Sequence, residues 1–200
     1  MGLAGLLGAP RESRSLVIFA HGSGSGRLSP RNNDVARALR EAGLATLLMD
    51  LLTPQEEADR RNVFDIRLLA SRLLLATQWA HDERSVSHLP IGYFGASTGA
   101  GAALTAAADQ GPEIYAVVSR GGRPDLAGDA LRNVTAPTLL IVGGEDGPVI
   151  RLNETALENL TCEKELVIVP GAGHLFEEPG TLARVMDHAV RWFVRHIPRK

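Results

Sequence analysis

The sequence predicts a single α/β domain, residues 1–200, built on a doubly wound and mostly parallel sheet of six strands. Two observations lead to this fold class. Short apolar runs alternate along the whole chain with longer segments of helical periodicity. No linker rich in Ser, Gly or Pro interrupts the alternation, and 200 residues is an ordinary length for one domain.

The six predicted strands are brief apolar runs that show no alternation of apolar and polar residues. Such runs are typical of strands covered by helices on both faces of a sheet. They occupy residues 15–20, 45–51, 91–96, 114–119, 137–144 and 165–171.

The predicted helices lie between these strands, at residues 32–43, 63–83, 97–110, 153–160 and 179–197. In residues 63–79 the apolar side chains recur at steps of three and four, as one buried helix face requires. Strands that alternate with helices form βαβ units, and these units make the sheet parallel.

Residues 1–14 fall outside this alternation. Their apolar run has no basic residue before it, which argues against a secretory signal and favours a loose terminus or a packing segment. The longest uncharged run, residues 89–108, has 20 residues and is long enough to span a bilayer. Because it contains Pro90 and several glycines, we interpret it as a strand, a turn and a helix of the core.

Composition narrows the classes of partner. The formal net charge of −2 favours neither nucleic acid nor an anionic membrane as a partner. The single cysteine, Cys162, excludes an internal disulfide and fits a reducing compartment, so we expect a cytoplasmic location.

Ser97 follows the third predicted strand, inside the sequence GASTG at residues 95–99. A strand that turns sharply into a helix holds such a serine exposed and strained, and the flanking glycines remove side chains that would collide in the turn. The N-terminus of the following helix stabilises negative charge on the serine oxygen. We therefore predict Ser97 as a nucleophile, the alternative being a tight turn with an incidental serine.

Asp146 and His174 each follow a later predicted strand, and ligand sites in open parallel sheets form at the carboxyl ends of strands. An imidazole near neutral pH can take the proton of a serine hydroxyl, and a carboxylate can hold the imidazole in the required tautomer. We therefore predict a triad of Ser97, Asp146 and His174.

The sequence offers rivals for the acid and the base. Asp125, after the strand at 114–119, is the alternative acid, but Asp146 lies two residues beyond a Gly-Gly pair in a tight loop. Structural or surface positions are expected for the remaining histidines, which are His21, His81, His88, His188 and His196.

Backbone N–H groups usually stabilise the oxyanion of acyl transfer. Thr98 follows the nucleophile directly and is one predicted donor; Ser23, in the glycine-rich loop after the first strand, is the other. Gly22 and Gly24 allow the backbone to approach a ligand, so we predict them as substrate-binding positions, with His21 bracing the loop. A nucleotide-binding loop is the alternative, but GSGSGR lacks both the G-x-G-x-x-G spacing and the lysine of a P-loop.

With these motifs the sequence resembles the α/β-hydrolase superfamily and, within it, the dienelactone hydrolase-like branch. The resemblance covers nearly the whole chain and implies an α/β-hydrolase fold that cleaves esters or lactones without a cofactor or metal. The similar segments are FAHGSGSG at 19–26, LLMDLLTPQEE at 47–57, GYFGASTGA at 92–100, VVSRGGRPDLAG at 117–128, LLIVGGEDGPV at 139–149 and PGAGHLFEEPG at 170–180.

Two departures from this family refine the expectation. Dienelactone hydrolase proper uses a cysteine nucleophile, whereas this chain has Ser97, so an ordinary serine esterase is expected. Many relatives insert a cap domain where this chain has only residues 120–136, so we expect no cap and an open cleft suited to short esters. Arg120 and Arg123 in that segment are candidates for attracting an anionic substrate, the alternative being solvated surface charges.

Together these features predict a carboxylesterase that cleaves short-chain esters, or lactones, through an acyl-enzyme intermediate. An acyltransferase or thioesterase with the same triad is the first alternative. A binding module with this fold but without catalysis is the second. The predicted partner is a small-molecule ester.

Overall fold

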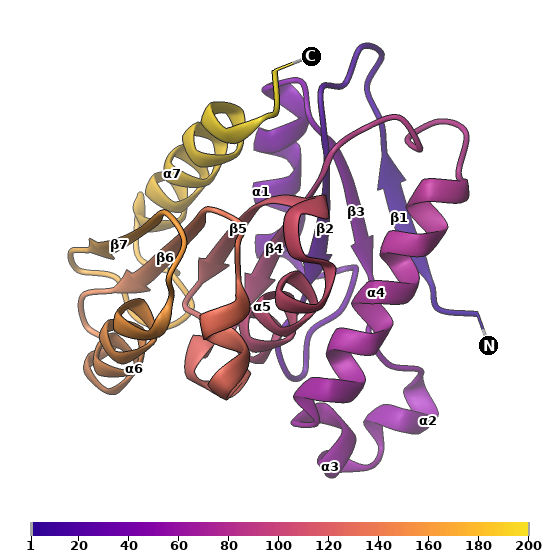
Figure 1. The fold of residues 1–200 in the computed structure, drawn as a ribbon. Helices are drawn as coiled ribbons and strands as arrows, with labels where there is room; N and C mark the ends of the chain where they lie inside the picture. Colours follow the sequence, from indigo (N-terminus) through magenta and orange to yellow (C-terminus); the bar gives the residue numbers. More distant parts are fainter. Residues whose placement is uncertain (1, 200) are drawn as a thin grey trace.

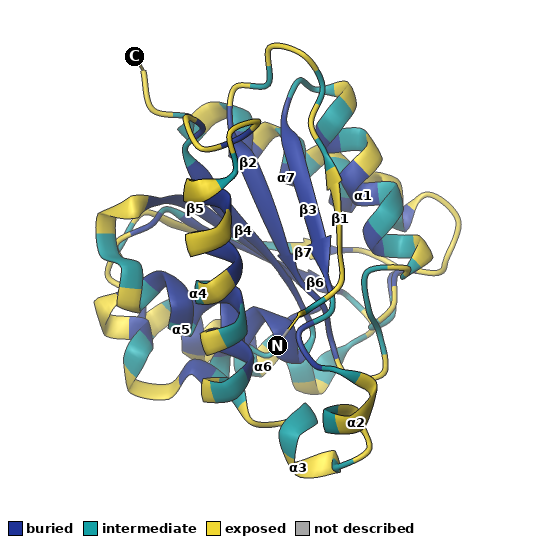
Figure 2. Cartoon of the chain, turned by 90° about the vertical axis from the view of Figure 1, so that its right-hand side faces the viewer, coloured by how far each residue is buried: buried dark blue, intermediate teal, exposed yellow. Residues whose placement is uncertain are grey.

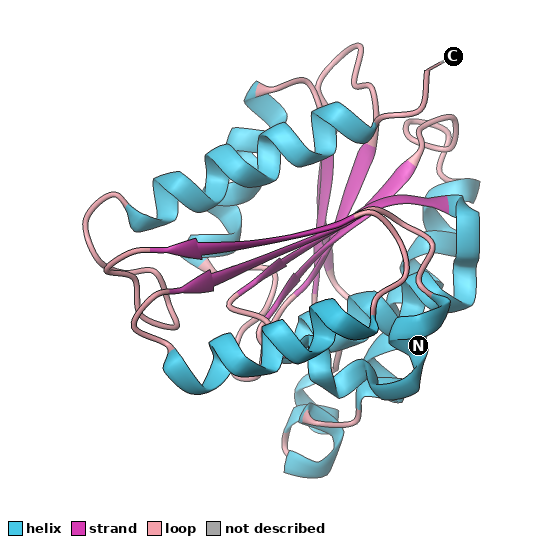
Figure 3. Ribbon diagram, turned by 60° about the vertical axis from the view of Figure 1, so that its left-hand side comes forward, coloured by secondary structure: helices cyan, strands magenta, loops and turns pink. Residues whose placement is uncertain are grey.

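The computed structural model describes residues 2–199, which form a seven-stranded sheet with helices on both faces (Figure 1 and Figure 3). The strands follow the order β1-β3-β2-β4-β5-β6-β7, and every neighbouring pair is parallel except β1 and β3. They are β1 (Gly5–Gly8), β2 (Leu16–Ala20), β3 (Ala45–Met49), β4 (Ile91–Ala96), β5 (Ile114–Arg120), β6 (Thr138–Gly143) and β7 (Lys164–Val169). The predicted doubly wound α/β fold, with its six parallel strands, is confirmed.

The helices divide between the two faces of the sheet (Figure 3). One layer contains α1 (Pro30–Glu41) and α7 (Thr181–His196), which pack against each other and against β3 and β5. The other layer contains α4 (Ile66–Asp82), α5 (Thr98–Gln110) and α6 (Gly147–Asn159). The short helices are α2 (Pro54–Glu57) and α3 (Arg60–Val63), with the 3₁₀ helices η1 (Gly111–Glu113) and η2 (Pro124–Asn133).

The five central strands are buried along their whole length, as Figure 2 shows. Alternate residues of one strand therefore enter different cores: Ile18 packs in the α4–α5 layer, and Val17 and Phe19 pack in the α1–α7 layer. Because both layers are apolar, these strands have no polar face. This explains why the strand segments of the sequence lack alternation.

The N-terminal segment differs from its prediction. Met1 lies outside the described residues, but residues 5–8 of the expected loose segment form β1, an edge strand antiparallel to β3 with Leu6 opposite Leu48. A run of four residues bounded by glycines gives little strand signal, and its backbone hydrogen bonds to β3 hold it in the sheet. The sheet therefore has seven strands, not six.

The connection from β5 to β6 contains a turn and η2 and no inserted domain, so the predicted absence of a cap at this point is confirmed. None of the helices within residues 2–199 is long and apolar enough to cross a membrane.

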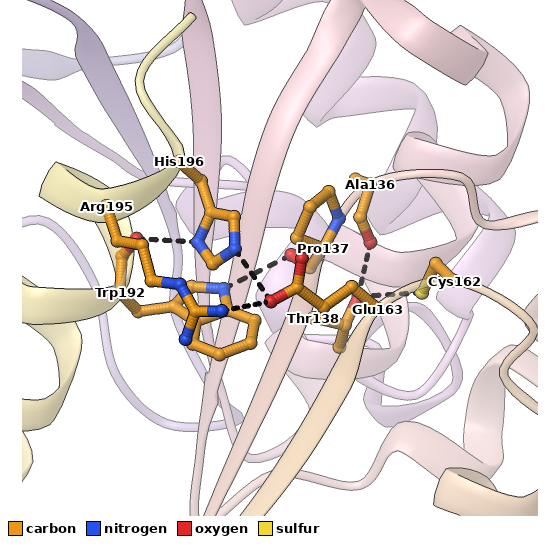
Figure 4. A network of polar contacts seen from close by, with 8 residues as sticks. All are labelled: Ala136, Pro137, Thr138, Cys162, Glu163, Trp192, Arg195 and His196. Atoms are coloured by element: carbon orange, nitrogen blue, oxygen red, sulfur yellow. Dashed lines mark hydrogen bonds and ion pairs between the residues drawn. The ribbon is translucent and has the colours of Figure 1, made fainter.

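A polar network at the amino ends of β6 and β7 holds the last helix against the sheet (Figure 4). Trp192 donates to the carbonyl of Pro137 at 3.2 Å, and Arg195 and His196 contact the carboxylate of Glu163 at 2.9 Å and 3.2 Å. The thiol of Cys162 borders this network, 3.8 Å from Thr138 Oγ1. Burial raises the pKa of the Cys162 thiol, which disfavours the reactive thiolate.

Tyr115 joins two strands that are not neighbours. Its hydroxyl lies 2.9 Å from the hydroxyl of Ser15, which precedes β2, while β4 runs between β2 and β5. The ring fits because Gly92 of β4 has no side chain: a Cβ there would lie 3.0 Å from the Tyr115 ring. Burial raises the pKa of Tyr115, so the hydroxyl stays neutral in the core.

We expect Tyr115→Phe to lower the free energy of unfolding by about 1–2 kcal/mol, because Ser15 keeps a buried hydroxyl without its partner. Urea denaturation followed by circular dichroism measures the change. Removing both hydroxyls, with Ser15→Ala added, should cost less than the sum of the single changes. Strictly additive losses would show that the two hydroxyls do not interact.

Candidate active site

Ser97 forms the junction between β4 and α5 and has an unusual backbone, with φ of 51° and ψ of −125°. A positive φ is rare for a residue with a side chain and persists only where the surroundings enforce it. Here the Ser97 N–H donates to the carbonyl of Arg120 at 3.4 Å, and the Ser97 carbonyl accepts from the N–H groups of Ala100 and Arg123 at 3.0 Å each. The sharp, strained turn expected at Ser97 is therefore present.

The glycines beside Ser97 allow helix and sheet to approach closely. A Cβ on Gly95 would lie 2.5 Å from the Cα of Ala100, and one on Gly99 would lie 2.1 Å from the carbonyl oxygen of Ala20. A Cβ on Gly22, in the neighbouring loop, would lie 2.7 Å from the Cβ of Ser97. Glycine is thus required at all three positions by contact with backbone or with Ser97 itself.

We expect Gly99→Ala to lower the free energy of unfolding by about 1–3 kcal/mol, because its methyl group collides with rigid backbone. The shift of α5 should also misplace Ser97 and lower turnover of a small ester by about 10²-fold. Gly147→Ala is the matched control, since a Cβ there meets nothing within 4 Å. Equal stability and turnover of the two variants would contradict this account of the turn.

Asp146 and His174 meet in space although 28 residues separate them in the chain. Asp146 precedes α6, His174 lies in the loop between β7 and α7, and His174 Nδ1 lies 2.6 Å from Asp146 Oδ2. The Asp146 side chain is 13% exposed and that of His174 is 38% exposed, so the pair stands at the molecular surface. The rival acid, Asp125, instead pairs with Arg123 at 2.8 Å.

Ser97 and His174 border the same turn from two sides. The turn after β5 bonds to Ser97 through Arg120 and Arg123, and its Gly121 lies against His174, where a Cβ would be 2.8 Å from the His174 carbonyl oxygen. The hydrogen bonds among residues 2–199 include none between Ser97 Oγ and the His174 ring. Catalytic hydrogen bonds are often long before substrate binds, so the absence of this hydrogen bond is compatible with a triad.

The loop after β2 lies against Ser97 through Gly22, and its shape is set by His21. The buried His21 ring accepts the N–H of Leu51 on Nε2 at 2.9 Å, so its proton is on Nδ1, which lies 2.9 Å from the Gly22 carbonyl. The predicted brace is thus present. Gly24 is exposed, with φ of 68°, and has no atom near its missing side chain.

Ser23 and Thr98, the predicted oxyanion donors, line one small cavity of about 10 Å³, roughly the space of one water molecule. Leu52, Glu57 and Val63 close the cavity from the β3–α4 connection. The sequence predicted no helix at residues 52–62 and began the next helix at Val63, whereas Val63 ends α3 and α4 begins at Ile66. The sequence of this connection does contain a helix-start signal for α2. Thr53 and Glu56 form a capping box around Pro54, the pattern that begins many helices.

Arg120 lies at the end of β5 but is only 7% exposed, so the alternative of a solvated surface charge does not describe it. Its guanidinium donates to the side chain of Asn32 in α1 at 3.1 Å, and its Nε has no hydrogen-bond partner within the described part of the chain. Burial and the nearby Arg31 lower the pKa of Arg120 to about 10. The described residues contain no cluster of three or more His, Cys, Asp or Glu side chains suited to a metal ion.

Known proteins resemble this chain in sequence and fold. The family model for the dienelactone hydrolase family matches residues 3–191. The crystal structure of dienelactone hydrolase from Anabaena variabilis ATCC 29413 is 57% identical and superposes with a TM-score of 0.95, covering 98% of this chain and 93% of that one. Est1E from Butyrivibrio proteoclasticus, at 18% identity, covers 98% of this chain and 95% of that one with a TM-score of 0.84, and it supports the fold alone.

A curated relative bears a name of a different kind. A Mycobacterium tuberculosis protein named putative phosphoribosyl transferase is 59% identical over 195 residues, which are 98% of this chain and 44% of that protein. The chain therefore spans less than half the length of this relative.

Proposed function

Because the chain belongs to the dienelactone hydrolase family, we propose that it is a serine hydrolase that cleaves short-chain carboxylic esters or lactones through an acyl-enzyme intermediate. The observation that supports this most is the backbone of Ser97, which combines a positive φ with a position between a buried strand and a helix N-terminus. Strain of this kind is maintained where a reactive group must be exposed.

In the proposed first step, Ser97 Oγ attacks the ester carbonyl carbon while His174 Nε2 takes the hydroxyl proton. The carboxylate of Asp146, 2.6 Å from His174 Nδ1, holds the ring in the tautomer that leaves Nε2 free and stabilises the imidazolium. The N–H groups of Ser23 and Thr98 would stabilise the negative oxygen of the tetrahedral intermediate.

His174 next acts as an acid to complete acylation, and it acts as a base again when water removes the acyl group. The imidazolium of His174 gives its proton to the leaving alcohol oxygen as the C–O bond breaks, leaving Ser97 acylated. Water then loses a proton to His174 and attacks the acyl carbon. The returned proton restores the Ser97 hydroxyl and releases the acid, so no cofactor is required by this scheme.

Short substrates are proposed because of the surroundings of Ser97. The β5–β6 connection adds no cap over the site, and the cavity beside Ser23 and Thr98 measures only about 10 Å³. A long acyl chain would find little apolar surface there to offset its ordering. The serine nucleophile also supports ordinary esters in preference to the dienelactone of the cysteine enzymes.

A series of p-nitrophenyl esters with acyl chains of increasing length tests the proposal. We expect kcat/KM to be highest for the shortest acyl groups and to fall as the chain lengthens, and Ser97→Ala should lose about 10⁶-fold in turnover of each ester. Absence of turnover with every ester in the series would contradict esterase activity.

The same triad would serve an acyltransferase or a thioesterase. Acyl transfer requires an acceptor other than water, so added alcohols or amines would then lower the yield of free acid. A thioesterase would prefer thioesters to the matched oxygen esters. A binding module without catalysis would leave Ser97 unlabelled by a fluorophosphonate reagent.

The name of the mycobacterial relative suggests phosphoribosyl transfer, but this chain spans only 44% of that protein. We propose that the activity in that name does not belong to the part that this chain matches. The glycine-rich loop after β2 lacks the spacing and the lysine of a phosphate-binding loop, which supports this assignment. Release of pyrophosphate from a phosphoribosyl diphosphate by this chain alone would contradict it.

A further inference from the structure

An apolar groove lies at the β1 edge of the sheet and shares no lining residue with the cavity beside Ser23 and Thr98. It has a volume of about 510 Å³ and runs between β1 and α4, with no charged side chain among its lining residues. Its walls include Leu3, Leu7, Met49, Leu75 and Trp79. In Figure 2 the β1 strand and the outer side of α4 are exposed at this edge.

Large apolar side chains protrude around this groove. Leu7 on β1 is 38% exposed, and Leu75 and Trp79 on α4 are 57% and 42% exposed. Leu6, on the opposite face of β1, is 42% exposed. Exposed apolar patches rimmed by polar surface are typical of protein–protein contacts.

The strand beside the groove has an unpaired edge. The sheet order places β1 at one end, so its backbone N–H and C=O groups on the outer side have no strand partner among residues 2–199. Edge strands are normally protected from pairing by charged residues, as β7 is at the opposite edge by Lys164 and Glu165. Residues 2–10 contain no charged side chain, so the β1 edge lacks this protection.

We propose that a second copy of this chain pairs with this edge, β1 against β1, in antiparallel orientation. A two-fold axis perpendicular to the sheet generates such a pair and keeps the two α4 helices on the same face of the joined sheet. The joined surfaces are both neutral, and each strand offers the donors and acceptors that the other needs.

The side chains of β1 define the register of this pairing. Leu7 lies opposite Leu47 and lines the groove on the α4 face, together with Gly5, whereas Leu6 lies opposite Leu48 on the other face. Residues directly opposite each other in an antiparallel pair share a face, so within β1 (Gly5–Gly8) Leu6 can pair only with Leu6 or Gly8 of the second copy.

Pairing of Leu6 with Leu6 of the second copy places Leu7 opposite Gly5 of that copy. Gly5 has no side chain, and its place on the α4 face is part of the groove. The Leu7 side chain of each copy then fills the space beside Gly5 of the other. The alternative register brings two Leu7 side chains together and leaves the groove beside Gly5 unfilled, so the first register is the one proposed.

Sedimentation equilibrium of the purified chain tests the pairing, and it should give a dimer at micromolar concentration. Leu7→Lys introduces a charge into the interface between the two β1 strands and should yield a monomer with an unchanged circular dichroism spectrum. The matched control is Ile168→Lys, on the β7 edge, where an equally exposed apolar side chain (44%) is replaced; it should remain dimeric. A monomeric wild type, or a dimeric Leu7→Lys, would overturn the proposal.

The register is tested by disulfide trapping in a Cys162→Ser background. Opposite residues of an antiparallel pair have Cα atoms about 4.5–5.5 Å apart, within the range that a disulfide spans. Leu6→Cys should therefore form a covalent dimer under mild oxidation, and Leu7→Cys should not. A covalent dimer from Leu7→Cys alone, or from neither variant, would overturn the register. This experiment stays informative if Leu7→Lys fails to fold, and neither test depends on ester hydrolysis.

Discussion

Replacement of Ser97 by alanine is expected to lower kcat for p-nitrophenyl acetate by about 10⁶-fold, the loss typical of a serine nucleophile in a triad. The free energy of unfolding should change by less than about 1 kcal/mol, because alanine and serine bear the same backbone strain at φ of 51°. Single-turnover kinetics and thermal denaturation measure the two quantities.

The control for this substitution is Ser87→Ala. Ser87 is an exposed serine that precedes β4 and lies at the other end of that strand from Ser97. It should keep wild-type turnover and remain reactive toward a fluorophosphonate reagent, which Ser97→Ala should not. Turnover by Ser97→Ala above a tenth of the wild-type value would exclude Ser97 as the nucleophile.

Asp146→Asn should lower kcat by about 10⁴-fold with little change in KM, as is seen when the acid of such a triad becomes an amide. The side-chain amide can donate to His174 Nδ1 and so stabilise the tautomer whose proton is on Nε2, where the base must be free. Steady-state kinetics on the same ester would measure this split between kcat and KM.

Asp125→Asn separates the two candidate acids. Asp125 bonds to Arg123 and not to a histidine, so this variant should retain turnover within a few-fold of the wild type. A larger loss for Asp125→Asn than for Asp146→Asn would transfer the acid's role to Asp125.

The central fold was predictable because a strand that is buried on both faces of the sheet consists of a continuous run of apolar residues. Each of the six parallel strands is an apolar run, and the structure begins and ends them within two residues of the predicted bounds. The strained turn at Ser97 was predictable as well, since two glycines at fixed distances from a serine have few other uses between a strand and a helix. The local sequence determines both features.

The features that the sequence did not reveal depend on contacts between distant segments. β1 is a strand because four residues bond to the backbone of β3, and nothing within those four residues requires it. The burial of Arg120 similarly depends on Asn32, 88 residues away, which approaches only when α1 covers the sheet. The face of the sheet on which the Arg120 side chain lies follows from strand geometry, because Val118, two residues earlier in the strand, enters the α1–α7 core.

The helices α2 and α3 are an intermediate case. The capping box of Thr53 and Glu56 is a local signal, but a helix of four residues has too few apolar positions to show periodicity. The position of Glu57 beside the cavity at Thr98 consequently has no indication in the sequence pattern.

The two edges of the sheet differ in a way that limits the size of any assembly. A pair formed through β1 is isologous, so it uses the same edge of both copies and leaves only the two β7 edges at its ends. Those outer edges present Lys164 and Glu165, whose desolvation opposes further strand addition. Growth by strand addition would therefore stop at the proposed pair, and association through the neutral edge would not lead to fibres.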